Sequence, residues 1–276
     1  MRNLAFPSVE APFGEPIPSI HLPEAPLDLV VVQAQFPAIL AVDAQSGRDL
    51  VAQFQDRIRD SYPLLQEAHE VAIVFSEPEF APTASGGLLF RFSSTDHAWQ
   101  ISLSRSFVAL QTNSYTERVD LIQRFTVVLD ALAATLHPTM CERLGVRYSS
   151  HIADPLLLAR LPEFIRPEIV GAVVATDAAT DPVRRVHMVT DCMYAMADAS
   201  LRARWGIIPA GTTIDANIAP AATERFLIDI DVFSIAPIAF DPAVLVDRVS
   251  NFSDRQYRYF RWMVTPEYLV AHGARP

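Results

Sequence analysis

The predicted order of strands and helices is the same in the two halves of this chain of 276 residues. Residues 98–136 begin with the two-residue alternation of a strand and end with the periodicity of a helix, and residues 225–264 do the same. Each half is predicted as β-α-β-β-β-α, which indicates an α+β fold of two tandem units, residues 27–138 and 139–276. An internal duplication is the favoured interpretation, and two unrelated α+β segments in one domain are the alternative.

This order predicts antiparallel sheets with helices packed on one face. The helices would cover the apolar face, and the other face would be left to solvent, a partner, a ligand or the other unit. The uncovered face is therefore the candidate functional surface.

The hydrophobic periodicity of the first unit predicts a strand, a helix, three strands and a second helix. These elements are expected at residues 27–40, 47–62, 69–76, 86–94, 97–113 and 115–136. The alternation in the last of these strands is disturbed near Ser106, which indicates a bulge or a tight turn. Thr116 is the expected N-cap of the helix that follows.

The second unit is predicted to follow the same order, with its first helix broken by prolines into short pieces. Its elements are expected at residues 142–152, 156–172, 183–197, 199–211, 224–241 and 242–264. Asp241 is the expected N-cap of the last helix, because Pro242 fits the first helical position.

Residues 1–26 are predicted to form an extended arm, because proline fixes φ and removes backbone donors. The prolines are Pro7, Pro12, Pro16, Pro18, Pro23 and Pro26. The arm could lie along the body of the protein or stay loose.

Composition excludes several kinds of chemistry. All 22 basic residues are arginine, so a lysine Schiff base, a phosphate-loop lysine and a kinase-type lysine are excluded. The formal net charge of −10 argues against a surface for duplex nucleic acid. Cys141 and Cys192 lie far apart and lack the spacing of a zinc site or a disulfide framework. No cofactor and no metal are expected.

The N-terminal residues lack the pattern of a signal peptide, and no apolar run is long enough for a membrane span. We therefore expect a cytoplasmic protein with reduced thiols and no membrane contact.

Charged residues on two strands of the second unit form the main candidate site. Alternation places Asp229 and Asp231 on the polar face of one strand and Arg202 and Arg204 on that of another. If the strands pair, the arginines lie across from the aspartates, where opposite charges stabilise the sheet by a few tenths to about 1 kcal/mol. A solvated charge ladder is the simpler interpretation.

The functional interpretation of the same face is a polar groove. Arg143 and Arg147 on the strand at residues 142–152 would add to it, and Arg91, Ser102 and Ser104 would extend it into the first unit. Because guanidinium groups offer planar donors to carboxylates and phosphates, such a groove suits an anionic ligand or an acidic peptide.

Other candidates are weaker. Asp229 and Asp231 alone make a poor cation site, and the neighbouring arginines oppose one. His187 and Asp191 are about 13 Å apart in an extended strand, too far for direct interaction. An arginine stripe on the last helix could be a solvated face or could contact a partner or a nucleic-acid backbone; it comprises Arg255, Arg258 and Arg261.

Several short motifs in this chain resemble a sporadically distributed family of uncharacterised bacterial proteins of about this length. The motifs are Phe36-Pro37, Tyr62-Pro63, Trp99 followed by Tyr115-Thr116, and Arg143, Gly145, Arg147 and Tyr148. The family usually has a polar residue, often asparagine, after the Arg-Tyr pair, where this chain has Ser149-Ser150. The resemblance implies a mobile-element, defence or toxin–antitoxin context and supplies no catalytic residues.

Three functions remain open from the sequence. The favoured one is a non-enzymatic protein that binds a protein partner or an anionic ligand on the arginine-rich face. The second is an enzyme acting on an anionic small molecule, with Asp229, Asp231 or His187 as acid–base residues. The third, which the net charge opposes, is a saddle that binds nucleic acid. A homodimer is compatible with each of them.

Overall fold

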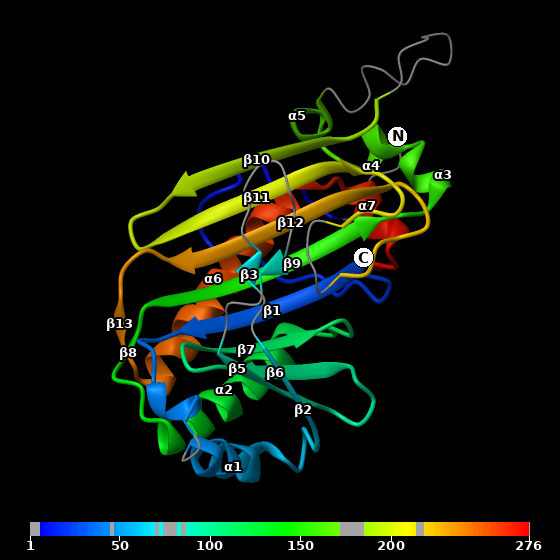
Figure 1. Ribbon diagram of the computed structural model, residues 1–276. Helices are drawn as coiled ribbons and strands as arrows, with labels where there is room; N and C mark the ends of the chain where they lie inside the picture. Colours follow the sequence, from blue (N-terminus) through cyan, green and yellow to red (C-terminus); the bar gives the residue numbers. More distant parts are fainter. Residues whose placement is uncertain are drawn as a thin grey trace.

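A computed structural model of the chain describes residues 6–44, 47–69, 72–73, 82–83, 87–171, 185–213 and 218–275. The fold is of the α+β class, as predicted. Its central feature is one antiparallel sheet of nine strands, in the order β10-β11-β12-β9-β1-β7-β6-β5-β2 (Figure 1).

The strands of this sheet come from most of the length of the chain. They are β1 (Leu27–Gln35), β2 (Leu64–His69), β5 (Leu88–Ser93), β6 (Trp99–Leu103), β7 (Phe107–Thr112), β9 (Arg143–Ile152), β10 (Met188–Ala195), β11 (Ala199–Ile208) and β12 (Arg225–Ser234). Two small two-stranded pairings are formed by β3 (Ala72–Ile73) with β4 (Pro82–Thr83) and by β8 (Met140–Cys141) with β13 (Ile238–Ala239).

The pairing of β1 with β9 joins the two predicted units into a single sheet. Val32 lies opposite Val146, and Ala34 lies opposite Leu144. The sequence predicted an antiparallel sheet in each unit, and the structure joins the strands of both units in one antiparallel sheet. Local periodicity contains no information about which strands of distant segments become neighbours.

In the described ranges, three helices longer than ten residues and several short ones accompany the sheet. They are α1 (Gly47–Ile58), α2 (Arg118–Thr135), α3 (Pro155–Leu158), α4 (Leu161–Phe164), α5 (Pro167–Val170), α6 (Pro242–Met263), α7 (Pro266–Ala271) and the 3₁₀ turn η1 (Leu40–Val42). The long helices α2 and α6 pack against each other and lie on the same side of the sheet (Figure 1).

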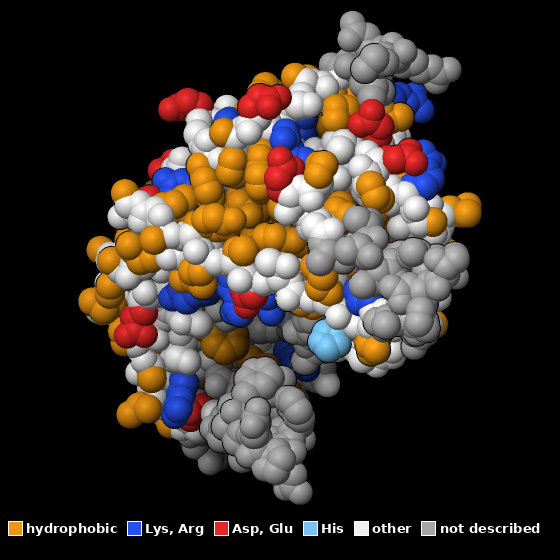
Figure 2. All heavy atoms as spheres, turned by 90° about the horizontal axis from the view of Figure 1, so that it is seen from above, with side chains coloured by type: hydrophobic (Ala, Val, Ile, Leu, Met, Phe, Trp, Pro, Cys, Tyr) orange, Lys and Arg blue, Asp and Glu red, His pale blue; other side chains and the backbone are white. Residues whose placement is uncertain are grey.

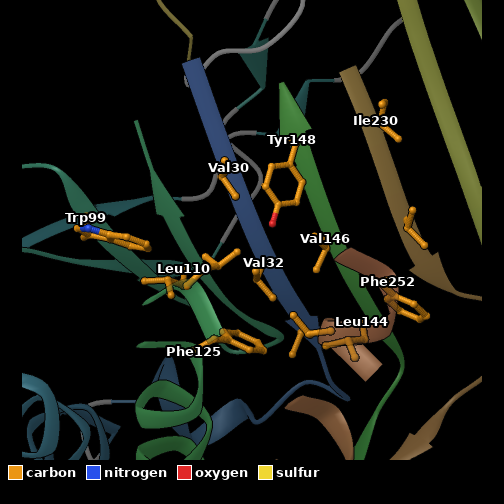
Figure 3. Packing of buried hydrophobic residues seen from close by; sticks show 14 of the residues in the cluster. Val30, Val32, Trp99, Leu110, Phe125, Leu144, Val146, Tyr148, Ile230 and Phe252 are labelled. Carbon is orange, nitrogen blue, oxygen red and sulfur yellow. The ribbon is translucent and has the colours of Figure 1, made fainter. Parts of the chain in front are cut away.

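The hydrophobic core lies between these helices and the sheet. Figure 3 shows Val32, Val146 and Leu144 of the central strands projecting toward the same space as Phe125 of α2 and Phe252 of α6. All of them are buried, so the core is continuous across the β1–β9 junction.

The predicted helix starts are partly correct. Asp241 is the N-cap of α6, and its side chain accepts a hydrogen bond from Ala243 N at 2.9 Å. In α2 the N-cap is Glu117, one residue after the expected Thr116, and its side chain makes no capping hydrogen bond.

The strand predicted at residues 97–113 is two strands, β6 and β7, joined by a tight turn. Ser104 N donates to Phe107 O at 2.9 Å, and Ser106 N donates to Ser104 Oγ at 3.2 Å. The disturbed alternation near Ser106 therefore marks a reversal of the chain.

The sheet ends at β2, a strand that the hydrophobic periodicity did not predict. Of the strand expected at residues 69–76, the described part contains β3, which lies outside the main sheet. Residues 70–71 and 74–76 lie outside the described residues.

Residues 6–26 form no helix or strand and run along the helix layer. Arg258 of α6 donates to Glu15 O at 2.6 Å, and Arg261 donates to Pro7 O at 3.2 Å. Arg255 pairs with Asp198 at 2.7 Å. Two arginines of the predicted stripe thus hold the chain's own N-terminal arm.

Candidate functional site

The charged strand face lies on the side of the sheet opposite α2 and α6. Strand pairing sets Arg204 opposite Asp229 and Arg202 opposite Asp231, which confirms the predicted cross-strand arrangement. Arg147 of β9 lies opposite Asp231 on the other side of β12. We call the set Arg143, Arg147, Arg202, Arg204, Asp191, Asp229 and Asp231 the charged strand face.

Asp229 is the centre of this face. Its Oδ1 accepts a hydrogen bond from Arg147 Nε at 2.6 Å, and its Oδ2 accepts from Arg204 Nε at 2.9 Å and from Arg204 Nη2 at 2.6 Å. Asp229 is only 2% exposed. One buried carboxylate therefore holds two guanidinium groups in fixed positions.

The other members of the charged strand face form two further pairs. Arg143 Nη2 donates to Asp231 at 2.7 Å, and its guanidinium lies 4.3 Å from the centre of the Phe233 ring. Burial raises the pKa of the Asp231 carboxyl, and Arg143 opposes that shift. Arg202 does not bind Asp231 across the strand but pairs with Asp191 of β10 at 2.9 Å.

Arg91 does not join this group. It lies on β5, opposite Ser102 and Gln66. Three strands lie between β5 and β9, so four strand spacings, or about 19 Å, separate the two. Ser104 is buried in the β6–β7 turn. The predicted extension of the site into the first unit therefore remains separate from its centre.

The residues considered for acid–base chemistry are not assembled with one another. His187 is exposed, and no hydrogen bond joins it to Asp229 or Asp231 among the described residues. Cys141 is buried, which raises the pKa of its thiol to about 11 and disfavours the reactive thiolate.

Within the described ranges, no cluster of three or more His, Cys, Asp or Glu side chains is placed to hold a metal ion. A search of the same residues found no helix long and apolar enough to cross a membrane.

A pocket of about 330 Å³, which no local sequence pattern predicted, lies on the helix side of the sheet. Its walls come from the arm, the end of β9, the start of α2, the middle of α6 and α7. The main polar lining residues are Tyr115, Thr116, Tyr148, Ser150, Ser253, Gln256, Tyr257 and Tyr268. We call this the arm pocket.

The arm closes one side of the arm pocket. Ile20 N donates to the Tyr257 hydroxyl at 2.8 Å, which ties the arm to α6. Ser19, His21, Thr116 and Glu117 are exposed at its rim. The pocket is thus enclosed by segments that are far apart in the sequence.

The floor of the arm pocket is rich in tyrosine. Tyr115 and Tyr148 meet edge to face with ring centroids 5.4 Å apart. Burial is the main cause that raises the pKa of Tyr115, Tyr148 and Tyr268, so their hydroxyls are protonated at neutral pH. These hydroxyls can therefore act as hydrogen-bond donors.

His272 packs against Tyr268 of this floor, and we expect it to make the free energy of unfolding depend on pH. Its ring lies 4.3 Å from that of Tyr268, and its Nδ1 lies 3.1 Å from the Glu24 carbonyl oxygen. Burial lowers its pKa below the ordinary value of 6.5. As the pH falls below that value, the unfolded chain binds a proton that the folded protein does not, so the free energy of unfolding should decrease.

Urea denaturation at about pH 7.5 and about pH 5.5 would measure this decrease. His272→Asn should reduce it, whereas the exposed His187→Asn should leave it unchanged. An equal decrease in wild type and His272→Asn would contradict the assignment.

Tyr115, Thr116 and Tyr148, which belong to the motifs quoted above, meet at the arm pocket. The only local signal of the pocket was tyrosine at a strand-to-helix junction, and that signal is weak. Comparison with protein-family models and with curated proteins gave no match for this chain.

Proposed function

We propose that this chain is a non-enzymatic binding protein whose charged strand face contacts a protein partner. The observation that carries the proposal is the fixed array of guanidinium groups around buried Asp229. Arginine is enriched at protein interfaces because its planar group donates several hydrogen bonds and also packs against apolar side chains.

A protein partner suits this face better than a small anion. Arg143, Arg147, Arg202 and Arg204 are each already paired with a carboxylate. A free anion would have to compete with those carboxylates, whereas a protein surface can add both donors and acceptors to the existing pairs.

Exposed apolar side chains next to the charged strand face support the same proposal. Met193 is 58% exposed and Val189 is 41% exposed, and both lie on β10 on the same side as Asp191. Figure 2, which looks down on the β10 side of the molecule, shows a broad hydrophobic patch bordered by arginine and acidic side chains. Apolar surface bordered by polar groups is typical of an interface.

We also propose that residues 27–138 and 139–276 are related by duplication. In each unit the first strand lies beside the last one, with β1 next to β7 and β9 next to β12. The antiparallel β1–β9 pair would then lie on the approximate two-fold axis between the units.

Quantitative affinity capture from a lysate of the source organism would test the binding proposal. The variant Arg202→Ala/Arg204→Ala should reduce the amount of captured partner about tenfold or more, because it removes two arginines from the proposed interface. Met193→Ala/Arg202→Ala changes only exposed side chains and should also reduce capture, while its free energy of unfolding falls by no more than about 1 kcal/mol.

The matched control is Arg48→Ala/Arg59→Ala, which removes two exposed arginines from the α1 region, away from the charged strand face. It should capture the partner as wild type does. Equal partner profiles for wild type and both interface variants would refute the proposal.

A further inference from the structure

We propose that the arm pocket binds a small molecule with a flat apolar body and a carboxylate group. The pocket lies on the helix side of the sheet, away from the charged strand face, so this site is separate from the proposed protein interface. Its volume of about 330 Å³ is at the small end of the range of ligand pockets, roughly 300–1,000 Å³.

One buried hydroxyl in the pocket, that of Tyr268, has no hydrogen-bond partner in the described part of the chain. Tyr268 is 1% exposed, and no hydrogen bond to its hydroxyl is found among the described residues. Ser253, which is 2% exposed, also lines the pocket, and its hydroxyl is shared with Tyr148. Buried polar groups are nearly always hydrogen-bonded, and leaving one unpaired costs about 1–3 kcal/mol. A ligand oxygen that accepts from the Tyr268 hydroxyl would remove that cost.

The start of α2 adds a positive potential at the same place. Glu117, Arg118 and Val119 line the pocket, and α2 is 18 residues long. The Glu117 side chain does not cap the helix, so the first backbone N–H groups remain available to a carboxylate. The unpaired Tyr268 hydroxyl, which also lines the pocket, requires the same kind of acceptor independently of the helix.

The side-chain charges near the pocket do not oppose this assignment. Arg118 is held in an ion pair by Asp254, so the pair contributes little net charge. Glu117 lies at the exposed rim, where water screens its carboxylate. The groups inside the pocket are hydroxyls, one amide and backbone N–H groups, all of which can donate to an oxyanion.

The remaining walls set the shape of the ligand. Ile20, Leu22 and Leu27 from the arm side and Phe260 from α6 provide apolar surface. Together with the Tyr115 and Tyr148 rings, they suit a flat aromatic or short aliphatic body.

Benzoate and benzamide are matched probes, because they share a ring and differ mainly in charge. We expect benzoate to bind the full chain with a dissociation constant on the order of 1 mM, and benzamide to bind about tenfold or more weakly. Ligand-observed NMR titration would measure both. Failure of benzoate to bind, or equal affinity for the two probes, would overturn the proposal.

Substitutions would locate the site. Tyr268→Phe removes a hydroxyl and keeps the ring, and Ser253→Ala removes a hydroxyl with little change in volume. Each variant should weaken benzoate binding about tenfold. Tyr62→Phe is the matched control, since Tyr62 is another buried tyrosine and does not line the arm pocket. Unchanged benzoate affinity in both Tyr268→Phe and Ser253→Ala would overturn the assignment to this pocket.

Discussion

Replacing Asp229 with alanine is expected to lower the free energy of unfolding by about 3–5 kcal/mol, because removing one partner of a buried ion pair leaves uncompensated charge. Here a single carboxylate serves both Arg147 and Arg204, and their side chains are only 19% and 21% exposed. Urea denaturation monitored by circular dichroism would measure the loss from the transition midpoint and slope.

Asp191→Ala is the matched control for this substitution. Asp191 also pairs with an arginine, Arg202, but its side chain is 45% exposed. Water can solvate Arg202 after the change, so we expect a loss of no more than about 1 kcal/mol. Equal losses for the two variants would show that Asp229 is not the centre of the charged strand face.

Replacing Gly206 with alanine is expected either to detach β10 from the sheet or to lower the free energy of unfolding by about 2–5 kcal/mol. Steric overlap and backbone strain act together at this position. Gly206 has φ of +144°, and a Cβ atom there would lie 1.9 Å from the Met188 carbonyl oxygen. Gly206 pairs with Val189, so the overlap falls directly on the β10–β11 contact.

Hydrogen exchange would separate these two outcomes. We expect β10 amides to lose protection in Gly206→Ala while β9 and β1 amides keep it. Gly211→Ala is the control, because Gly211 also has positive φ, +75°, but no atom of the described residues lies within 4 Å of the added Cβ. If Gly211→Ala cost as much as Gly206→Ala, steric overlap with β10 would not be the cause.

Local patterns predicted the second half of the fold well. The alternation in residues 225–233 set the faces of β12, and Asp241-Pro242 set the start of α6. The cross-strand position of Arg204 and Asp229 followed from the same alternation, because side chains in a strand change faces at every residue.

Features that depend on distant segments were not predictable in the same way. The single sheet depends on the pairing of β1 with β9, and no local sequence pattern specifies that pairing. The β6–β7 turn was visible only as a disturbance near Ser106, because both strands share similar hydrophobic alternation.

The candidate site shows the same limit. The sequence predicted that Arg202 and Arg204 lie across from Asp229 and Asp231 if their strands pair. The backbone of Arg202 does lie opposite Asp231, but its side chain pairs with Asp191 on the other neighbouring strand. The arm pocket was missed because residues from the arm, β9, α2, α6 and α7 meet only in the folded chain.

The β1–β9 pairing also determines when the protein can finish folding during synthesis. More than a hundred residues separate the end of β1 at Gln35 from the start of β9 at Arg143. At ribosomal rates of roughly 5–20 residues per second, the free edge of β1 waits on the order of ten seconds for its partner. During that interval the nascent chain carries an open strand edge in what later becomes the middle of the sheet, and it is then most prone to aggregation and to chaperone capture.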